Sequence, residues 1–512
     1  MTALASVAAP EDIRFLLDGR LVRVGDLPRT TTVLEYLRNE AHRTGTKEGC
    51  AEGDCGACTV LLGELAADGT RVNYRAVNSC IRLLPTIDGQ ELVTVESLAA
   101  PDGALHPVQQ AMVDHHASQC GFCTPGFVMS LVGLYLESPH PDREQVLDAV
   151  SGNLCRCTGY RPIIDAGMAM TEYPAPVHWS RGAPAEAARC AALRALKRTS
   201  SLRTPGFTAP TTLDGLAAAL EREPDSLVLA GGTDIGLWVT KQLRELPPLV
   251  YLGEVAELKQ IRRSSSGLTI GAAVSLADAW NALVQAFPPL AEQAQRFGSV
   301  PVRHSGTLCG NLANGSPIGD SLPPLLALGA ELELRRGSRT RRVPLDAFYL
   351  GYQRKDLAPG EFIVSVTVPT AAPGCRFASY KWSKRNEQDI SAVCAAFAVL
   401  VEEGRVSTAR LAFGGMAAIA KRARAAEQAL IGAAWTTASI ELAAAGLAED
   451  FSPLTDLRAS GDYRLTAAAN LLRRFHAGQA GTGGAVRIAD VAADDGVAAD
   501  AAEPDAAGAG RA

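Results

Sequence analysis

Alternating apolar and polar positions open the chain and predict a small β-rich region. Residues 13–24 fit a β-hairpin that turns at Asp18-Gly19, a pair that favours the tight turn between two strands. A short helix is expected over residues 31–39, and the run from Thr59 to Leu62 is expected to form a strand.

The pattern then becomes helical. Pro107 is suited to the first turn of a helix that ends before Cys120. Thr124-Pro125 fits an N-cap residue followed by proline at the first helical position, and it predicts a helix through Glu137. Another helix is expected from Asp142 to Val150, so this region predicts a small helical bundle.

Residues 175–206 have prolines at both ends and no strand pattern, so we expect an exposed linker with a short helix at Ala185 to Lys197. An α/β pattern begins after the linker. Thr212 to Arg222 has apolar residues at helical spacing, and Ser226 to Ala230 is expected to be a strand.

The last patterned region combines strands and helices. Strands are expected at Tyr380 to Ser383, Ala392 to Val401 and around Val406 to Phe413, and helices at Ala423 to Ile431 and Ala438 to Ala445. From about Gly478 the chain is mostly Ala, Gly and Asp without aromatic residues. Residues 478–512 are therefore expected to be a disordered tail.

Composition and charge narrow the class of protein. A chain of 512 residues predicts about two to four domains, and its net charge of −6 gives no basic patch of the kind that nucleic-acid binding needs. The N-terminus does not resemble a secretory signal, and the most apolar stretch, Phe127 to Leu136, is far shorter than the ~20 residues of a membrane span. We therefore expect a cytoplasmic protein, away from membranes, whose reduced cysteines can bind metal.

Eight of the twelve cysteines fall before residue 160, in two groups. The first has the spacing C-x4-C-x2-C followed by a distant cysteine, and consists of Cys50, Cys55, Cys58 and Cys80. This is the plant-type arrangement for a 2Fe–2S cluster. The glycines around it allow a sharply bent loop that points N–H groups at sulfur, and they are Gly49, Gly53 and Gly56. Zinc is the alternative, but zinc sites tend to use paired C-x2-C ligands and the x4 spacing argues against them.

The second group has the spacing C-x2-C, then 31 residues, then C-x-C, and consists of Cys120, Cys123, Cys155 and Cys157. Its two pairs are expected at helix termini. The C-x-C pair is unusual for zinc, because two sulfurs must diverge from one tight turn. The other cysteines are scattered and are expected to be buried small apolar residues: Cys190, Cys309, Cys375 and Cys394.

Two glycine-rich loops predict a phosphate-containing cofactor. The strand at Ser226 to Ala230 runs directly into Gly231 to Gly236, where small residues let backbone N–H groups close on a pyrophosphate. The string matches neither the Rossmann nor the P-loop motif, and a simple strand-to-helix turn is the alternative. A second loop, Ser305 to Pro317, is rich in Gly, Ser, Thr and Asn. Asp320 follows it and either accepts a hydrogen bond from a ribose hydroxyl or caps a helix over Leu322 to Leu328.

These motifs resemble those of one known family. GCAEGDCGACTV (residues 49–60), QCGFCTPGF (119–127) and GNLCRCTGYRP (152–162) resemble the iron–sulfur domain of the molybdenum hydroxylases, which include xanthine dehydrogenase, aldehyde oxidase and carbon monoxide dehydrogenase. LAGGTDIG (229–236) and SGTLCGNLANGSPIGD (305–320) are similar to the FAD domain of the same family.

The resemblance implies an α+β multidomain fold. The implied units are a β-grasp 2Fe–2S ferredoxin-like domain at 10–95, a four-helix 2Fe–2S-binding domain at 96–175, a linker at 176–204, a vanillyl-alcohol-oxidase-type FAD-binding domain at 205–372 and an α+β C-terminal flavoprotein subdomain at 375–477. It also implies that the helical cluster lies nearer a molybdenum cofactor, with Gln119 approaching the pterin, and that the other cluster lies nearer the flavin. For Gln119 the alternative is an ordinary polar residue at a helix end.

The residues carried over as FAD contacts are Val228, Leu229, Ala230, Gly231, Gly232, Thr233, Asp234, Ile235, Phe297, Thr307, Leu308, Cys309, Gly310, Asn311, Asp320, Val364 and Lys381. Gly232 is a departure, because vertebrate relatives have asparagine there, so one side-chain contact is expected to be lost. Residues Ser383 to Asp389 match a mobile loop beside the isoalloxazine ring, with a solvated loop as the alternative.

The family's molybdenum-binding portion is a further large domain that we expect on a separate large subunit, which makes this chain a redox subunit. The fused order of iron–sulfur and FAD domains is similar to the small subunit of bacterial xanthine dehydrogenases, which oxidise hypoxanthine and xanthine to urate. We therefore expect NAD as the acceptor and a dimer of heterodimers. The alternatives are the same role with an aldehyde or N-heterocycle substrate, and a non-catalytic scaffold stabilised by zinc.

Overall fold

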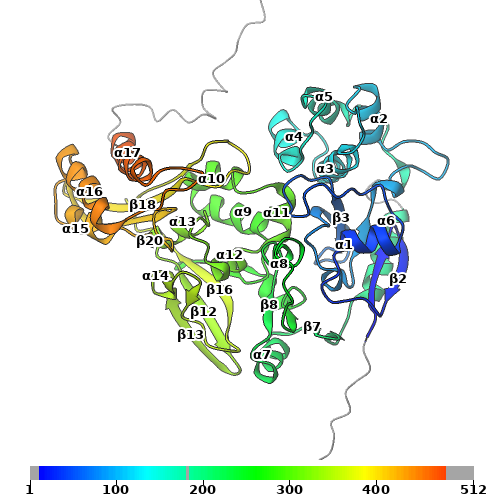
Figure 1. Cartoon of the computed structure of the whole chain (residues 1–512), viewed down its shortest axis with the longest axis horizontal. Helices are drawn as coiled ribbons and strands as arrows, with labels where there is room; N and C mark the ends of the chain where they lie inside the picture. The colour runs from blue at the N-terminus through cyan, green and yellow to red at the C-terminus, as the bar shows by residue number, and fades with distance from the viewer. Residues whose placement is uncertain (1–10, 180–183, 480–512) are drawn as a thin grey trace, which may run out of the picture.

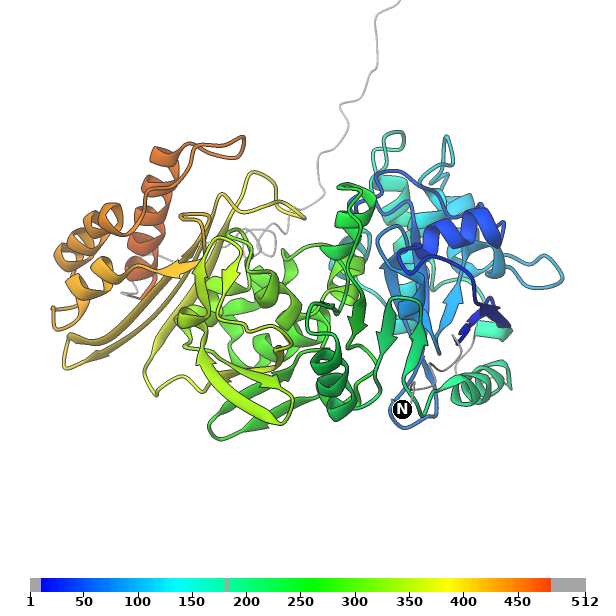
Figure 2. The same cartoon turned by 60° about the horizontal axis from the view of Figure 1, so that its bottom comes forward.

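The computed structural model describes residues 11–179 and 184–479. Figure 1 shows the N-terminal units in blue and cyan on one side of the molecule, the green middle of the chain in the centre, and the orange C-terminal unit on the other side. In the rotated view of Figure 2, the C-terminal unit again lies at the end of the molecule away from the N-terminal units.

The first unit is a β-grasp sheet of five strands in the order β2-β1-β5-β3-β4. Its strands are β1 (Ile13–Leu17), β2 (Arg20–Val24), β3 (Thr59–Leu65), β4 (Val72–Asn78) and β5 (Glu91–Val93). The predicted hairpin is confirmed, and Asp18 and Gly19 at its turn have φ values of 51° and 78°. The predicted helix begins as α1 (Val33–Glu35), capped by Thr32, and continues as a π-helix, η1 (Tyr36–Glu40).

The second unit contains four helices, the number that the family resemblance implies. They are α2 (Pro107–Asp114), α3 (Thr124–Glu137), α4 (Arg143–Val150) and α5 (Arg161–Ala169), of which α5 was not predicted. The predicted cap of α3 is wrong by one residue. Cys123 is the N-cap, and Thr124 already belongs to the helix, where its hydroxyl lies 2.7 Å from that of Ser118.

The segment predicted as an exposed linker is partly buried. It contains a 3-10 turn, η4 (Val177–Trp179), and α6 (Pro184–Leu196). Cys190, Leu193 and Leu196 are buried against the first sheet, because their spacing of three residues places them on one face of α6. The prediction of a helix is confirmed, but the prediction that the segment is exposed is wrong.

The central unit has two sheets. The first has the order β6-β7-β9-β8, formed by β6 (Leu202–Thr204), β7 (Phe207–Ala209), β8 (Leu227–Leu229) and β9 (Leu249–Tyr251). The second is antiparallel, in the order β10-β11-β16-β12-β13, formed by β10 (Ile261–Ser264), β11 (Gly267–Gly271), β12 (Glu331–Arg336), β13 (Arg339–Pro344) and β16 (Phe362–Pro369). A small pair, β14 (Tyr349–Gly351) and β15 (Arg354–Lys355), lies between β13 and β16 in the chain.

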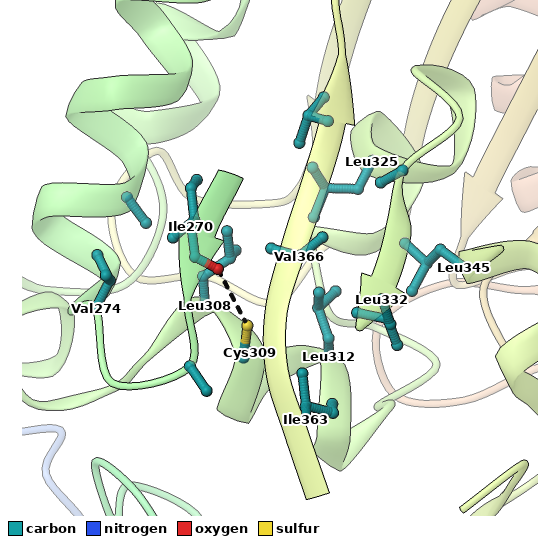
Figure 3. Packing of buried hydrophobic residues seen from close by; sticks show 14 of the residues in the cluster. Ile270, Val274, Leu308, Cys309, Leu312, Leu325, Leu332, Leu345, Ile363 and Val366 are labelled. Carbon is teal, nitrogen blue, oxygen red and sulfur yellow. Dashed lines mark hydrogen bonds between the residues drawn. The ribbon is translucent and has the colours of Figure 1, made fainter. Parts of the chain in front are cut away.

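Helices surround these sheets. They are α7 (Leu213–Arg222), α8 (Ile235–Thr240), α9 (Leu276–Ala286), α10 (Ala291–Gln295), α11 (Val300–Ser305), α12 (Leu308–Asn314), α13 (Leu322–Ala327) and α14 (Leu345–Phe348). Figure 3 shows how Leu308 and Leu312 of α12 pack beside Ile270 of β11 and Val366 of β16. Cys309 lies among these side chains, with its sulfur 3.9 Å from the carbonyl oxygen of Ile270 (Figure 3).

The C-terminal unit is a four-stranded sheet covered by helices. The strands are β17 (Arg376–Trp382), β18 (Val393–Glu402), β19 (Arg405–Gly414) and β20 (Lys421–Arg422), and the helices are α15 (Arg424–Leu430), α16 (Thr437–Asp450) and α17 (Gly461–Gln479). The predicted strands and the first two helices are confirmed, whereas α17 was not predicted. Of the tail predicted to be disordered, Gly478 and Gln479 belong to α17 and the remainder lies outside the described residues.

Within the described parts of the chain, no helix combines the length and the apolar character needed to span a membrane.

Candidate functional site

The first cysteine group lies in the loop before β3, with Cys80 just after β4. Cys58 and Cys80 are buried, and their sulfur atoms are 3.2 Å apart. The N–H groups of Glu52, Asp54 and Cys55 each donate to the sulfur of Cys50 over 3.4 Å. Contact with the Cys55 thiol is the largest of several effects that lower the pKa of Cys50, and the same contact raises the pKa of Cys55, so this pair favours a single thiolate at Cys50.

The second cysteine group is divided between two loops of the helical unit. Cys123 caps α3, which confirms the predicted position at a helix terminus, whereas Cys155 and Cys157 lie within the loop between α4 and α5. The hydroxyl and the N–H of Thr158 lie 3.1 and 3.5 Å from the sulfur of Cys155. Cys120 and Cys157 are exposed, unlike Cys58 and Cys80 of the first group.

Both groups have the donor set that a 2Fe–2S cluster requires, four thiols with N–H or hydroxyl groups directed at sulfur. Contacts within the first group join the thiols in pairs: Cys50 with Cys55, Cys50 with Cys80, and Cys58 with Cys80. Among the described residues, no three His, Cys, Asp or Glu side chains form a group that could hold a single metal ion.

The two cysteine loops touch through their backbones. The N–H of Leu154 donates to the carbonyl of Cys55 over 3.0 Å, and the side-chain amide of Asn153 donates to the carbonyl of Gly56 over 3.1 Å. Because Leu154 directly precedes Cys155, its backbone hydrogen bond links the ligand loop of the first group to that of the second. A Cβ atom at Gly126 would lie only 2.2 Å from the carbonyl oxygen of Gly56, so the start of α3 also packs directly on the first loop.

The two glycine-rich loops of the central unit line one cavity of about 520 Å³, a size that suits a cofactor. A Cβ atom at Gly231 would lie 2.0 Å from the carbonyl oxygen of Ser305, so the two loops approach each other with no room for a side chain. Gly232 has a φ of 76°, which favours glycine. The cavity therefore has the close backbone approach expected of a phosphate-binding site, and its residues fit FAD.

The predicted FAD contacts divide into two sets. Those that line the cavity are Val228, Ala230, Gly231, Gly232, Thr233, Asp234, Ile235, Thr307, Cys309, Gly310 and Asn311. Leu229 and Leu308 are fully buried, because they point from β8 and α12 into the core. Phe297 packs on Trp280 with ring centroids 5.3 Å apart, and Val364 is half-buried beside the lining residue Ile363.

Asp320 and Lys381 lie outside this cavity and pair with each other. The ammonium group of Lys381 lies 2.5 Å from the carboxylate of Asp320, and the hydroxyl of Ser391 donates to the same carboxylate over 2.7 Å. Both charged side chains are buried. Ser321, not Asp320, is the N-cap of α13, so the capping alternative for Asp320 is wrong.

Lys355 is a cavity residue that the sequence did not indicate. Its ammonium group donates to the carbonyl of Ala313 over 2.5 Å at the end of α12, and the side chain lines the cavity. Burial lowers the pKa of Lys355, while the nearby Asp234 acts in the opposite direction. A single lysine after a turn has no periodicity or motif, so only the fold brings it to the glycine-rich loops.

Residues Ser383 to Asp389 form a loop that is fixed in part by hydrogen bonds to other units, so it is not fully solvated. The guanidinium of Arg296 donates to the hydroxyl of Ser383 over 3.0 Å and to the carbonyl of Asn386 over 3.3 Å. The side chain of Gln388 donates to the carbonyl of Ser151 at the end of α4. The loop therefore connects the central unit with the helical unit.

Helix α8 connects the cavity to the first cysteine group. It begins at Ile235, directly after the glycine-rich loop, and a Cβ atom at Gly236 would lie 2.4 Å from the carbonyl oxygen of Ile81, the residue after Cys80. The hydroxyl of Thr240 donates to the carbonyl of Ala51 over 2.7 Å. Figure 1 shows α8 at the side of the central unit that faces the N-terminal sheet.

Gln119 is exposed beside Cys120, in the loop between α2 and α3. It does not lie at a helix end, so that alternative is wrong. Among the scattered cysteines, Cys190, Cys309 and Cys394 are buried as predicted, but Cys375 is only half-buried.

The fold and these sites define a redox protein with two 2Fe–2S domains and one FAD-binding domain. Four family profiles match the chain: "2Fe-2S iron-sulfur cluster binding domain" at residues 16–83, a 2Fe–2S binding domain at 94–168, "FAD binding domain in molybdopterin dehydrogenase" at 200–371 and "CO dehydrogenase flavoprotein C-terminal domain" at 378–478.

Several known proteins are similar to the chain. Xanthine dehydrogenase of Emericella nidulans is 32% identical, over 86% of this chain and 36% of that protein. Xanthine dehydrogenase 2 of Arabidopsis thaliana is 30% identical, over 79% of this chain and 35% of that protein. The chain thus spans about a third of the length of these curated relatives. A solved carbon monoxide dehydrogenase from Hydrogenophaga pseudoflava has 32% identity and a TM-score of 0.49, covering 52% of this chain and 94% of that one.

The chain belongs to the iron–sulfur and FAD-binding family of the molybdopterin dehydrogenases, the family of xanthine dehydrogenase and carbon monoxide dehydrogenase. Its domains are accordingly of the kinds that bind two 2Fe–2S clusters and FAD.

Proposed function

We propose that this chain carries electrons in a xanthine-oxidising molybdenum hydroxylase. Electrons would come from a molybdenum cofactor on a large partner subunit and would leave to NAD at the FAD. Cys120, Cys123, Cys155 and Cys157 would hold the first cluster on this route, and Cys50, Cys55, Cys58 and Cys80 the second. The observation that carries the proposal is a continuous line of contacts from the Cys155 loop to the Cys50 loop and on to the flavin cavity.

The first step of this line is the contact between the two cysteine loops. The 3.0 Å hydrogen bond from the N–H of Leu154 to the carbonyl of Cys55 gives a path of one hydrogen bond between the ligand loops of the two groups. The exposure of Cys120 and Cys157 supports the direction, because the group nearer the surface is the one that a partner can approach.

The second step is the contact between the Cys80 segment and α8. Ile81 follows Cys80 and meets the backbone of Gly236, whereas Gly231 to Ile235 line the cavity. Leu237 of α8 packs with Cys58, Cys80 and Ile81 in one apolar cluster that separates the thiols from water. Bound FAD supplies the chemistry that joins single-electron transfer from iron–sulfur clusters to hydride transfer to NAD.

The residues of this chain bind and position the cofactors, and substrate oxidation would occur on the partner. Gly231, Gly232 and the loop that begins at Thr307 would bind the pyrophosphate through backbone N–H groups. Lys355 would place a positive charge beside the same phosphates. Asp320 and Lys381 would act beyond the cavity, where their ion pair holds the strand that leads into Ser383 to Asp389.

Xanthine is the proposed substrate because curated relatives that align with most of this chain are named xanthine dehydrogenase or xanthine dehydrogenase/oxidase. A second candidate function is the same electron transfer with a different substrate. The match of residues 378–478 to a CO dehydrogenase flavoprotein domain supports this second candidate. Aldehydes, N-heterocycles and carbon monoxide are therefore the substrates to compare with xanthine.

The test is xanthine-dependent NADH formation by the complex that co-purifies with the affinity-tagged chain. The expected result is NADH formation that a molybdenum-site inhibitor abolishes, together with a large subunit and the mass of a dimer of heterodimers. The variant Cys55→Ser should lose NADH formation but keep xanthine oxidation with a dye that takes electrons before the flavin. A complex with full molybdenum, iron and FAD that does not oxidise xanthine would exclude this substrate, and a chain without iron, acid-labile sulfide and FAD would exclude the whole proposal.

A further inference from the structure

Asn153 lies between the two cysteine groups and contacts both loops. Its side chain is buried, with 3% of its surface exposed. The amide nitrogen donates to the carbonyl of Gly56 over 3.1 Å, and the amide oxygen accepts the hydroxyl of Ser130 over 2.7 Å. Asn153 stands two residues before Cys155, whereas Gly56 stands between Cys55 and Cys58. A residue of one ligand loop is therefore hydrogen-bonded to the centre of the other.

The carbonyl that Asn153 binds belongs to a peptide group that faces sulfur. The carbonyl of Gly56 and the N–H of Ala57 are parts of one peptide unit. The N–H of Ala57 acts as a backbone hydrogen-bond donor to the sulfur of Cys55. A hydrogen bond at the carbonyl end polarises the peptide and strengthens the N–H donor at its other end.

Packing leaves little freedom in this contact. A Cβ atom at Gly56 would lie 2.3 Å from the carbonyl oxygen of Gly152, and Gly56 has a φ of 68°. The carbonyl of Gly56 also accepts the N–H of Thr59 over 3.1 Å and its hydroxyl over 2.7 Å. These two bonds are local to the first loop, so Asn153 is the partner of this carbonyl that comes from the second loop.

We propose that Asn153 is a positioning residue for electron transfer, which sets the spacing of the two clusters and raises the reduction potential of the Cys50 cluster through the Gly56–Ala57 peptide. This inference rests on the cluster assignments proposed above. N–H donors to cluster sulfur stabilise the reduced state, so the hydrogen bond favours the electron on the cluster that lies nearer the flavin.

The variant Asn153→Leu separates this role from simple packing. Leucine has nearly the same shape and carries no charge, but it offers no N–H to the carbonyl of Gly56 and no acceptor to the hydroxyl of Ser130. If Asn153 only filled space, the leucine variant would behave as the wild type. The matched control is Ser130→Ala, which removes the hydrogen bond between Ser130 and Asn153 and leaves the N–H donor of Asn153 in place.

The experiment uses the full complex with both clusters and FAD, titrated with reductant and followed by electron paramagnetic resonance. In Asn153→Leu and Asn153→Ala we expect the Cys50 cluster to become harder to reduce by about tenfold in the equilibrium constant, which for one electron is about 59 mV. We also expect weaker magnetic coupling between the two reduced clusters. Ser130→Ala should keep the wild-type potential.

The outcomes are distinct. A wild-type complex without two iron–sulfur signals would overturn the cluster assignments and the proposed function with them. Two normal signals with unchanged potential and coupling in Asn153→Leu would overturn only the role of Asn153. If Asn153→Ala does not assemble its clusters, Asn153→Leu alone decides, and an equal shift in Ser130→Ala would assign the effect to packing.

Discussion

Replacing Gly231 by alanine tests whether the glycine-rich loops hold the FAD. The added Cβ atom would lie 2.0 Å from the carbonyl oxygen of Ser305 and 2.6 Å from the Cα atom of Gly306. Real Cβ atoms essentially never approach other heavy atoms closer than about 3.0 Å, so the two loops must separate by about 1 Å. Both atoms that would be met belong to backbone, which cannot rotate away as a side chain could.

The expected loss follows from this displacement. Overpacking of a close contact costs about 1–3 kcal/mol, and every 1.4 kcal/mol is tenfold in a binding constant. Since both loops line the same cavity, the displacement moves their N–H groups away from the phosphates. We expect Gly231→Ala to weaken FAD binding by about 10- to 100-fold while the iron content remains unchanged.

The assay is the FAD-to-iron ratio of the purified protein, followed by rebinding of FAD to flavin-depleted protein. The matched control is Gly351→Ala, because a Cβ atom at Gly351 would meet nothing within 4 Å. Wild-type FAD affinity in Gly231→Ala would refute the assignment of this loop to the cofactor. Equal loss of FAD in Gly351→Ala would refute the argument from local geometry.

Three further predictions concern the clusters and the contacts between units. Cys55→Ser and Cys157→Ser should each remove one of two iron–sulfur signals in electron paramagnetic resonance, and loss of neither would contradict the assignments. Arg303→Met removes a buried guanidinium that lies 2.6 Å from Asp148, so the free energy of unfolding should fall by about 3 kcal/mol, measured by denaturant titration. Burial lowers the pKa of His106 to about 3, so the folded state resists a proton that the unfolded chain accepts near pH 6.5. The contribution of neutral His106 to the free energy of unfolding is therefore fully present above about pH 6.5, and it falls by up to about 1.4 kcal/mol per pH unit as the pH drops toward 3. The variant His106→Asn keeps a helix cap and should flatten this slope in denaturant titrations at pH 7 and 5.

The parts of the structure that the sequence predicts are those specified by neighbouring residues. Asp18-Gly19 has the composition of a hairpin turn, and this turn is confirmed. The helix expected from Asp142 to Val150 is also confirmed, with Asp142 as its N-cap. The exposure of α6 was predicted wrongly because its apolar residues Cys190 and Leu193 are few and stand among alanines. Helix α17 was missed, although its buried residues Ala468, Leu471, Leu472 and Phe475 recur at helical spacing.

The site residues follow the same rule: local sequence predicts those that belong to a motif, but not those that only the fold brings to the site. The cysteine spacings and the glycine-rich strings are local, and the strings lie on one cavity as predicted. Leu229 and Leu308 were carried over as part of continuous motifs, but neighbouring residues of a strand or helix point in different directions, and these two face the core. Lys355 and Arg303 could not be predicted, because their partners lie 42 and 155 residues away in the chain.

The contacts along the proposed electron path share one physical feature, which is backbone packed on backbone at glycine. A Cβ atom would lie 2.3 Å from the nearest atom at Gly56, 2.2 Å at Gly126 and 2.4 Å at Gly236, and in each case that atom is a carbonyl oxygen of another segment. Gly56 and Gly126 join the two cysteine loops, and Gly236, on the helix that leaves the flavin cavity, meets Ile81 in the segment after Cys80. Since a carbonyl oxygen cannot rotate away, any side chain at these positions would force the segments apart. Glycine therefore does more here than bend the ligand loops, because it lets the segments that carry the two cysteine groups and the flavin cavity pack backbone against backbone.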